Sequence, residues 1–177
     1  LTHRIAYLIG ENLATPYEIL AVTFTNKAAG EMRQRVAELL GQNSQNRSFM
    51  PYMGTFHSIC VRLLRQEGEH IGLPTNFIIF DESDRQSLIK QIVKQQKIDD
   101  KKSPIRSIAG MISGAKNELI SPAEFSSTAG TPLQKIVAQV FPLYEKGLRA
   151  QNALDFDDLI GRTVALFANN PEIQQKW

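Results

Sequence analysis

Apolar residues in the first part of the chain follow strand spacing and then helix spacing, twice over. The run from Glu18 to Phe24 is short, apolar and β-branched, which is typical of a buried parallel strand. The residues after it repeat apolar side chains at helix spacing until Gly41, which is expected to end that helix. A second candidate strand at 49–56 precedes a helix predicted from Thr55, with apolar positions at Phe56, Ile59, Cys60, Leu63 and Leu64. Residues 1–72 therefore predict an α/β fold.

Helix spacing alone governs the rest of the chain. Apolar residues repeat in this way over 88–93, 105–119, 133–148 and 156–167, with a short segment after Pro122. Pro104 can begin the second of these helices, and Pro142 is expected to kink or split the long third one. The pattern predicts a helical subdomain attached to an incomplete α/β core.

Composition is typical of a soluble globular protein. The chain has 177 residues, of which 42% are hydrophobic and 21% charged, enough for one domain or two small ones. Its apolar runs are only a few residues long, so we expect no membrane partner and a cytoplasmic protein. Helix spacing is present from the first residues, which suggests an excerpt of a longer protein.

Residue types for covalent or metal chemistry are sparse. Cys60 is the only cysteine and falls inside a helical pattern, so it is predicted to be a small buried residue without an internal disulfide. The three histidines, at 3, 57 and 70, are scattered, and no zinc site is predicted. His57 beside Ser58 is not read as a hydrolase pair, because adjacent residues on a helix point in different directions.

Positive charge is concentrated in the middle of the chain. Residues 84–116 carry eight Lys or Arg against three Asp or Glu, whereas 1–83 carry seven against eight and 117–177 five against seven. Such a segment can face phosphates, or it can be a solvated helix face. The basic side chains of the segment considered for phosphate contact are Lys90, Lys94, Lys97, Lys101, Lys102, Arg106 and Lys116.

The stretch FIIFDES, at 77–83, has the form of an acidic motif in a nucleotide hydrolase. There, a buried strand delivers one carboxylate to Mg²⁺ and a second to the attacking water, roles open to Asp81 and Glu82. The sequence has no GxxxxGK[ST] loop to hold the phosphates, however. Ser83 and Gln86 have capping-box spacing, so we interpret the stretch as the start of a helix.

The stretch LDFDDL, at 154–159, is interpreted in the same way. Its three aspartates look like a catalytic cluster, but the pattern also fits a helix start. Asp155 is then expected near the cap, with Phe156 and Leu159 buried.

Two further stretches place polar and aromatic residues between a predicted strand and a helix. They are AVTFTNKAAGEMRQRV at 21–36 and GTFHSICVRLLR at 54–65. Backbone N–H groups at a helix start bind phosphate, and an exposed phenylalanine ring stacks on a base. Both stretches are candidate surfaces for single-stranded nucleic acid.

These stretches closely resemble motifs of the UvrD/Rep/PcrA-type superfamily 1 DNA helicases. TFTNKAAGEM resembles motif Ia, TFHS resembles motif Ib, and LTHRIAYLI resembles the helix after the phosphate-binding loop. AKNELISP is similar to part of the inserted helical subdomain, and LDFDDLI to the segment that returns the chain to the motor core. The matches occur in order along nearly the whole chain.

The resemblance implies a fold in three parts. Residues 1–72 would form part of a P-loop (RecA-like) parallel sheet core of the 1A type. A mostly α-helical inserted subdomain of the 1B type would occupy 73–150, and 151–177 would return to the core.

The resemblance also implies a parent protein that uses ATP and Mg²⁺ to move 3′-to-5′ on single-stranded DNA and to unwind the duplex at a junction. In that family the Mg²⁺ carboxylates come after the LDFDDLI segment, so we expect no catalytic or nucleotide-binding residue before Trp177. The fragment alone is predicted to be inactive as an ATPase. DNA repair and replication are the processes that the resemblance suggests.

Matched position by position, the resemblance implies a set of DNA contacts. Motif Ia supplies Phe24, Thr25, Asn26 and Lys27, motif Ib supplies Thr55, Phe56, His57 and Ser58, and the inserted subdomain supplies Lys116 and Asn117. Core packing is the alternative role for an aromatic at a strand end, and it stays open for Phe56.

Two other functions stay open. One is a non-enzymatic nucleic-acid-binding or protein-interaction module that has kept a helicase-like fold. The other is a free-standing nucleotide hydrolase that uses Asp81 and Glu82.

Overall fold

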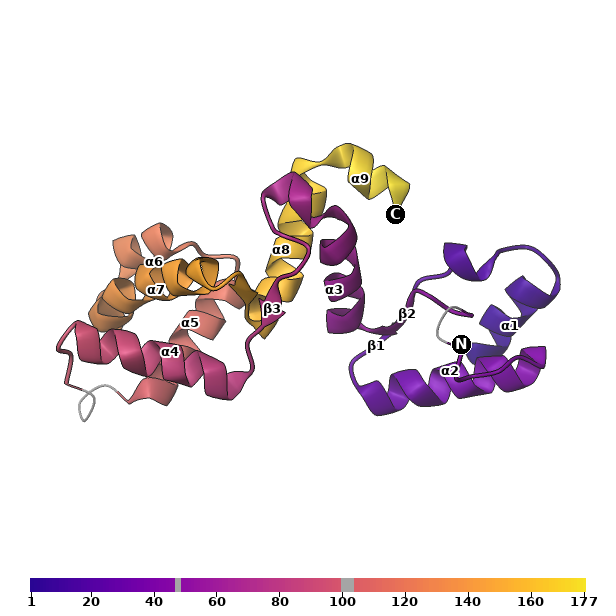
Figure 1. Cartoon of the computed structure of the whole chain (residues 1–177), viewed down its shortest axis with the longest axis horizontal. Helices are drawn as coiled ribbons and strands as arrows, with labels where there is room; N and C mark the ends of the chain where they lie inside the picture. The colour runs from indigo at the N-terminus through magenta and orange to yellow at the C-terminus, as the bar shows by residue number, and fades with distance from the viewer. Residues whose placement is uncertain (47–48, 100–103) are drawn as a thin grey trace. The chain divides into compact units, whose positions relative to one another are not determined.

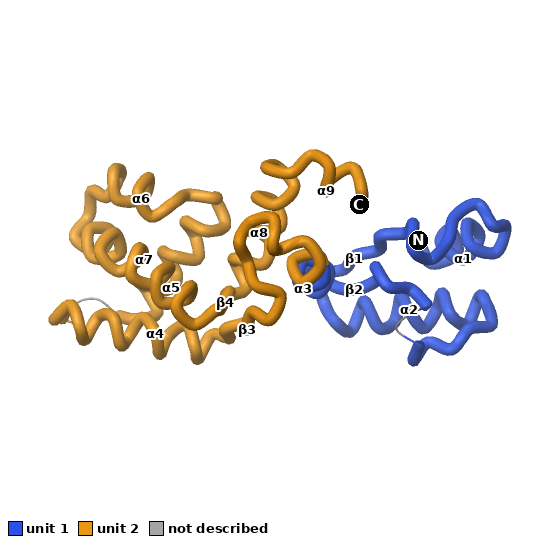
Figure 2. The backbone as a smooth tube through the Cα atoms, turned by 45° about the horizontal axis from the view of Figure 1, so that its top comes forward, with its two compact units in different colours: residues 1–62 blue, residues 63–177 orange. Residues whose placement is uncertain are grey.

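The computed structural model describes residues 1–46, 49–99 and 104–177. The chain divides into two compact units, Leu1–Arg62 and Leu63–Trp177 (Figure 2). The three-part division that the resemblance implies stays a prediction. Across the described ranges, none of the helices combines the length and the apolar character needed to cross a membrane.

The first unit contains two parallel strands joined by a helix. The helix α1 (Thr2–Gly10) and the 3₁₀ turn η1 (Pro16–Glu18) lead to β1 (Ala21–Thr23), α2 (Asn26–Leu40), β2 (Met53–Thr55) and the start of α3 (Phe56–Glu67) (Figure 1). β1 and β2 pair in parallel, with Ala21 opposite Met53 and Thr23 opposite Thr55. The predicted α/β fold is confirmed, with strands shorter than the apolar runs that signalled them.

The core of this unit lies between the strands, α1 and α2. Its buried side chains are Ile5, Ala21, Met32, Val36, Met50 and Met53. The guanidinium of Arg33 donates hydrogen bonds to the backbone carbonyls of Met50, at 3.1 Å, and Met53, at 2.5 Å. These bonds tie α2 to β2 and to the segment before it. Gly41 ends α2 in the left-handed region at φ 63°, as its position predicted.

Helices make up most of the second unit. After the 3₁₀ turn η2 (Gly68–Ile71), its elements are β3 (Ile78–Ile79), α4 (Glu82–Gln95), α5 (Ile105–Asn117), α6 (Pro122–Thr128), α7 (Pro132–Ala150), β4 (Ala153–Leu154), α8 (Phe156–Asn169) and α9 (Pro171–Lys176). Buried apolar residues of α4, α5 and α7 pack together in a core that includes Ile89, Ile112 and Phe141. The predicted helical content of this region is confirmed.

The proline inside α7 does not split the helix. The helix runs as one element of 19 residues through Pro142, which is exposed, so the expected split is wrong and the alternative, a kink, stays a prediction. A proline in a helix interior costs about 3 kcal/mol because it removes a hydrogen bond. Burial of Val140, Phe141 and Tyr144 on the opposite side of α7 offsets this cost.

Two short strands hold the ends of the helical region together. β3 and β4 pair in parallel, with Ile78 opposite Ala153 and Ile79 opposite Leu154. Each strand is followed by an aspartate that caps a helix. Segments some 75 positions apart in the numbering therefore run side by side into α4 and α8.

Candidate nucleic-acid interface

The carboxyl ends of β1 and β2 meet at one edge of the first unit. Because Thr23 and Thr55 are register partners, Phe24 and Phe56 leave their strands side by side. The centroids of the two rings lie 5.4 Å apart, with the planes tilted by 39°. Phe24 is 90% exposed and Phe56 41% exposed. We call Phe24–Lys27 together with Thr55–Ser58 the shelf.

The first half of the shelf is the start of α2. The Thr25 hydroxyl accepts a hydrogen bond from the Ala28 N–H at 3.1 Å and so caps the helix. The Thr23 hydroxyl donates to the Thr25 carbonyl at 3.1 Å. Asn26 and Lys27 are the first residues of the helix, and both are exposed. The positive end of α2 therefore opens beside the Phe24 ring.

The second half of the shelf is the start of α3. The buried Thr55 hydroxyl accepts from the Ser58 N–H at 3.2 Å, and the Ser58 hydroxyl donates to the Thr55 carbonyl at 2.8 Å. These two predicted DNA contacts are thus engaged in holding the turn. Between Thr55 and Ser58 in the sequence, Phe56 is exposed and His57 is half-buried.

Gly54 shapes this turn, although it was not among the predicted site residues. A Cβ added at Gly54 would overlap the Ser58 Oγ, so the serine can fold back over the strand only above a glycine. The available signal was a glycine at the end of a predicted strand, which often marks a close approach of other atoms.

Lys116, in the second unit, lies in a buried group of charges. Its side chain is 8% exposed, and its ammonium nitrogen lies 2.9 Å from Glu145, 2.8 Å from Asp155 and 2.9 Å from Asp158. Asp155 also accepts a hydrogen bond from the Tyr144 hydroxyl at 2.9 Å. We call these residues, with Arg85 beside Asp155 at 3.9 Å, the charged cluster.

Burial and pairing set the ionisation of the charged cluster. Burial lowers the pKa of Lys116, but its three carboxylate partners outweigh this effect and the net pKa is raised. Burial likewise raises the pKa of Asp155, while Lys116 and hydrogen bonds from Asp158 and Tyr144 bring it below its usual value. Burial, with the repulsion of neighbouring acids, raises the pKa of Asp158 to about 6 despite Lys116. Because the net pKa of Lys116 is raised, its ammonium group stays charged at neutral pH.

This position gives Lys116 a structural role in the second unit, while its contact with DNA stays a prediction. Asn117, next to it at the end of α5, is exposed. For Lys116, the helix spacing carried a signal of burial that was not used in the prediction. Lys116 follows Ile108 and Ile112 at steps of four, within the apolar stripe of the helix.

The other basic residues of the middle segment lie on the surface. Lys90 and Lys94 are exposed on α4, Lys97 follows that helix, and Arg106 is exposed at the start of α5. Lys101 and Lys102 lie outside the described residues. The exposed four remain available to phosphate.

Both acidic stretches are helix caps. Asp81 accepts from the Asp84 N–H at 2.9 Å, and Asp84 accepts from the Asp81 N–H at 3.1 Å. The helix start is confirmed, but the capping box is Asp81 with Asp84 and not Ser83 with Gln86. The difference arises because Asp81, two residues after the end of β3, already has the extended backbone of a cap.

The second cap repeats the first in a buried setting. Asp155 and Asp158 form the same reciprocal pair, which confirms Asp155 as the cap of α8. Leu159 is buried as predicted, whereas Phe156 is 47% exposed and that prediction is wrong. In the parts of the chain that the structure describes, no group of three or more His, Cys, Asp or Glu side chains is arranged to hold a metal ion.

Comparison with known proteins identifies the family of the chain. Residues 1–177 match the model of the UvrD/REP helicase N-terminal domain. The chain belongs to this family. Over 173 residues, 98% of the chain, it is 49% identical to the ATP-dependent DNA helicase PcrA of Bacillus subtilis (strain 168). It is 46% identical over its whole length to the enzyme of the same name from Staphylococcus aureus (strain Mu50 / ATCC 700699).

The match to these relatives is partial on their side. The chain spans 23% of the length of the Bacillus subtilis protein and 24% of the Staphylococcus aureus protein. The predicted helicase resemblance is confirmed at the level of the family.

Proposed function

We propose that the chain is part of the first motor domain of an ATP-dependent DNA helicase that moves 3′-to-5′ on single-stranded DNA. Membership of the UvrD/REP family supports the helicase assignment, and relatives named ATP-dependent DNA helicase PcrA support the use of ATP and DNA. In this proposal the chain contributes the DNA track and not the catalytic site. The direction of movement rests on the family resemblance.

The single observation that carries the DNA track is the exposed ring of Phe24. A phenylalanine that is 90% exposed at the end of a strand gains little from folding and is free to stack on a base. Phe56, 5.4 Å away, offers a second ring for the neighbouring base. The N-termini of α2 and α3 direct backbone N–H groups to the same edge, where they favour phosphate.

The residues present do not fit a site for ATP and Mg²⁺. The sequence has no GxxxxGK[ST] loop, and Asp81, the acid after β3, is engaged as a helix cap. We therefore assign no step of hydrolysis to this chain. The fragment alone is expected to lack ATPase activity, which also separates it from a free-standing hydrolase that uses Asp81 and Glu82.

The exposed lysines of α4 are proposed to contact the duplex ahead of the junction. Lys90 and Lys94 are one helical turn apart, at the spacing that places both on one face. Phosphate contacts of this kind carry no sequence preference and weaken as salt rises. Replacing both by alanine is expected to reduce duplex affinity and to flatten its salt dependence, with less effect on single strands.

Stacking on Phe24 is tested by anisotropy of a fluorescein-labelled oligothymidine. Phe24→Ala is expected to weaken binding about tenfold, within the range of about 1–3 kcal/mol for one stacked base. The matched control is Tyr7→Ala, an aromatic that is 61% exposed on α1. Equal affinities of wild type and Phe24→Ala would remove Phe24 from the track.

The motor is tested in the full-length protein. Single-stranded DNA should stimulate its ATP hydrolysis, and a duplex with a 3′ overhang should be unwound in preference to one with a 5′ overhang. DNA binding without either activity would favour the non-enzymatic module.

A further inference from the structure

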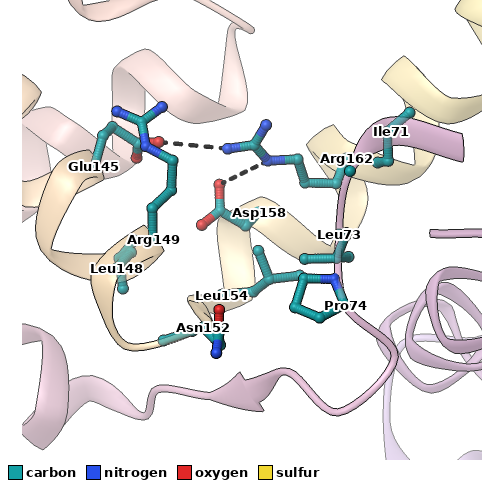
Figure 3. Close-up of a pocket in the computed structure, with 12 residues that line it drawn as sticks. Ile71, Leu73, Pro74, Glu145, Leu148, Arg149, Asn152, Leu154, Asp158 and Arg162 are labelled. Carbon is teal, nitrogen blue, oxygen red and sulfur yellow. Dashed lines mark ion pairs between the residues drawn. The ribbon is translucent and has the colours of Figure 1, made fainter. Parts of the chain in front are cut away.

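A pocket in the second unit lies beside the charged cluster, and most of the residues that line it lie outside that cluster. Its volume is about 230 Å³, and it lies between the turn at 71–74, the end of α7, β4 and the first turns of α8 (Figure 3). Leu73, Pro74, Leu148 and Leu154 give it apolar walls. Its polar side is formed by Glu145, Arg149, Asn152, Asp158 and Arg162.

The carboxylates in the pocket wall already have partners. Glu145 and Asp158 each lie 2.9 Å from the buried ammonium of Lys116. On the pocket side, Arg162 approaches Glu145 at 3.6 Å and Asp158 at 4.0 Å, as the dashed lines in Figure 3 mark. Their negative charge is therefore compensated from two directions.

Arg149 differs from the other charged residues of the wall. It is exposed in the last turn of α7, and within residues 1–46, 49–99 and 104–177 its guanidinium makes no hydrogen bond or ion pair. A guanidinium is a planar donor that binds a carboxylate through two parallel hydrogen bonds. The pocket thus combines apolar walls with a cation that has no partner among the described residues.

We propose that this pocket binds a small carboxylic acid with an apolar ring or chain. The apolar part lies against Leu73, Leu148 and Leu154, and the carboxylate pairs with Arg149. The volume suits such a ligand, because a closed cavity of about 150 Å³ already holds a benzene ring. This inference is independent of the DNA track and of the proposed motor activity.

An amine of the same size is the informative alternative. It would need an acid of the wall as its partner, but Glu145 and Asp158 are held by Lys116 and Arg162. It would also bring a positive charge toward Arg149. The structure therefore favours an acid over an amine.

The test uses the full-length protein and two fluorinated probes observed by ¹⁹F NMR, 4-(trifluoromethyl)phenylacetate and 4-(trifluoromethyl)benzylamine. The variants are Arg149→Ala and Arg149→Glu. The control is Lys146→Glu, which makes the same charge change at an exposed position on the same helix, outside the pocket wall. Thermal unfolding of each variant confirms that it is folded.

The acid is expected to bind the wild type with a Kd of about 1 mM, as is usual for a ligand of this size. Arg149→Ala should weaken binding of the acid at least fivefold, because one charge-assisted pair is lost. Arg149→Glu should abolish this binding, whereas Lys146→Glu should leave the affinity within about twofold of the wild type. If Arg149→Glu does not fold, the Arg149→Ala result decides. The proposal is overturned if the acid fails to bind the wild type at about 5 mM, if Arg149→Ala binds it equally well, or if the amine binds the wild type as tightly.

Discussion

The shelf and the charged cluster depart in opposite ways from the usual arrangement, in which apolar side chains are buried and charged side chains are exposed. The shelf leaves Phe24 90% exposed, although its ring would gain from burial. The charged cluster buries Asp155 completely and Lys116 almost completely, although both would gain from water. Each region includes residues that follow the end of a short parallel strand, Phe24 after β1 and Asp155 after β4.

The two regions differ in whether their unusual side chains have partners within the chain. The polar groups of the charged cluster find one another within the second unit, at 2.8–2.9 Å around Lys116. The Phe24 ring lies 5.4 Å from the Phe56 ring and is 90% exposed. We infer that the cluster serves stability and that the shelf serves binding. Four substitutions test this contrast.

The largest effect on stability is expected from Lys116→Met. The change removes the shared ammonium group from three buried carboxylates and leaves them with the looser pairs to Arg85 and Arg162, at 3.6–4.0 Å. Breaking a buried ion pair in this way costs about 3–5 kcal/mol of the free energy of unfolding. Urea denaturation measures the loss.

Lys90→Met is the matched control, because it removes the same charge from an exposed position on α4. Its effect should stay within about 0.5 kcal/mol, as for most surface changes. If the two variants lost equal stability, the cluster would not stabilise the second unit.

The next effect depends on pH and comes from Asp158. Its pKa is raised from 3.8 to about 6 by burial and neighbouring acids, so between these values the folded state holds a proton that the unfolded chain has released. The stabilisation from this proton is complete below pH 3.8 and is lost as the pH rises through 6. Asp158→Asn removes this dependence.

The difference in unfolding free energy, Asp158→Asn minus wild type, should therefore grow by about 1–3 kcal/mol between pH 4.5 and pH 7. Asp155 does not mimic this trend. Because its pKa is lowered, its contribution is present above 3.8 and is lost only as the pH falls through its folded pKa. Asp84→Asn, at the same position of the exposed cap, is the control, and an equal growth there would contradict the assignment.

These two predictions concern features that the sequence revealed only in part. The helix start at LDFDDL was predictable because an aspartate before an apolar repeat is a common cap. Burial of that cap was not predictable, since it depends on Lys116 and Glu145, which are distant in sequence. The available signal was a charged residue within an apolar stripe, at Lys116 on α5 and again at Glu145 on α7.

The shelf was more accessible to sequence reasoning, because each half is a continuous strand, turn and helix. The order of these elements and the position of Phe24 after a strand followed from local pattern and from the family motif. The pairing of β3 with β4 did not, since two-residue strands carry almost no periodicity. The closure of the Thr55 turn over Gly54 was signalled by no more than a glycine near the end of a predicted strand.

That turn gives the third prediction. Gly54→Ala places a methyl group against the Ser58 Oγ, which must rotate away and lose its 2.8 Å bond to the Thr55 carbonyl. The loss is expected to be about 1 kcal/mol of stability, the usual worth of one hydrogen bond, with weaker DNA binding as the turn shifts. Adding Ser58→Ala to Gly54→Ala removes the clash and should restore most of the DNA affinity. No recovery in the double variant would show that Ser58 itself contacts DNA.

The smallest effect on stability is expected at the most exposed residue of the shelf. Phe24→Ala removes a ring that contributes little to the core, so the free energy of unfolding should change by less than about 0.5 kcal/mol. Met53→Ala, a buried position in the neighbouring strand, is the comparison and should cost about 2–5 kcal/mol. A loss of DNA binding in Phe24→Ala with unchanged stability would separate binding from folding at a single residue. A large loss of stability would instead make Phe24 part of the core and remove the contrast between the shelf and the charged cluster.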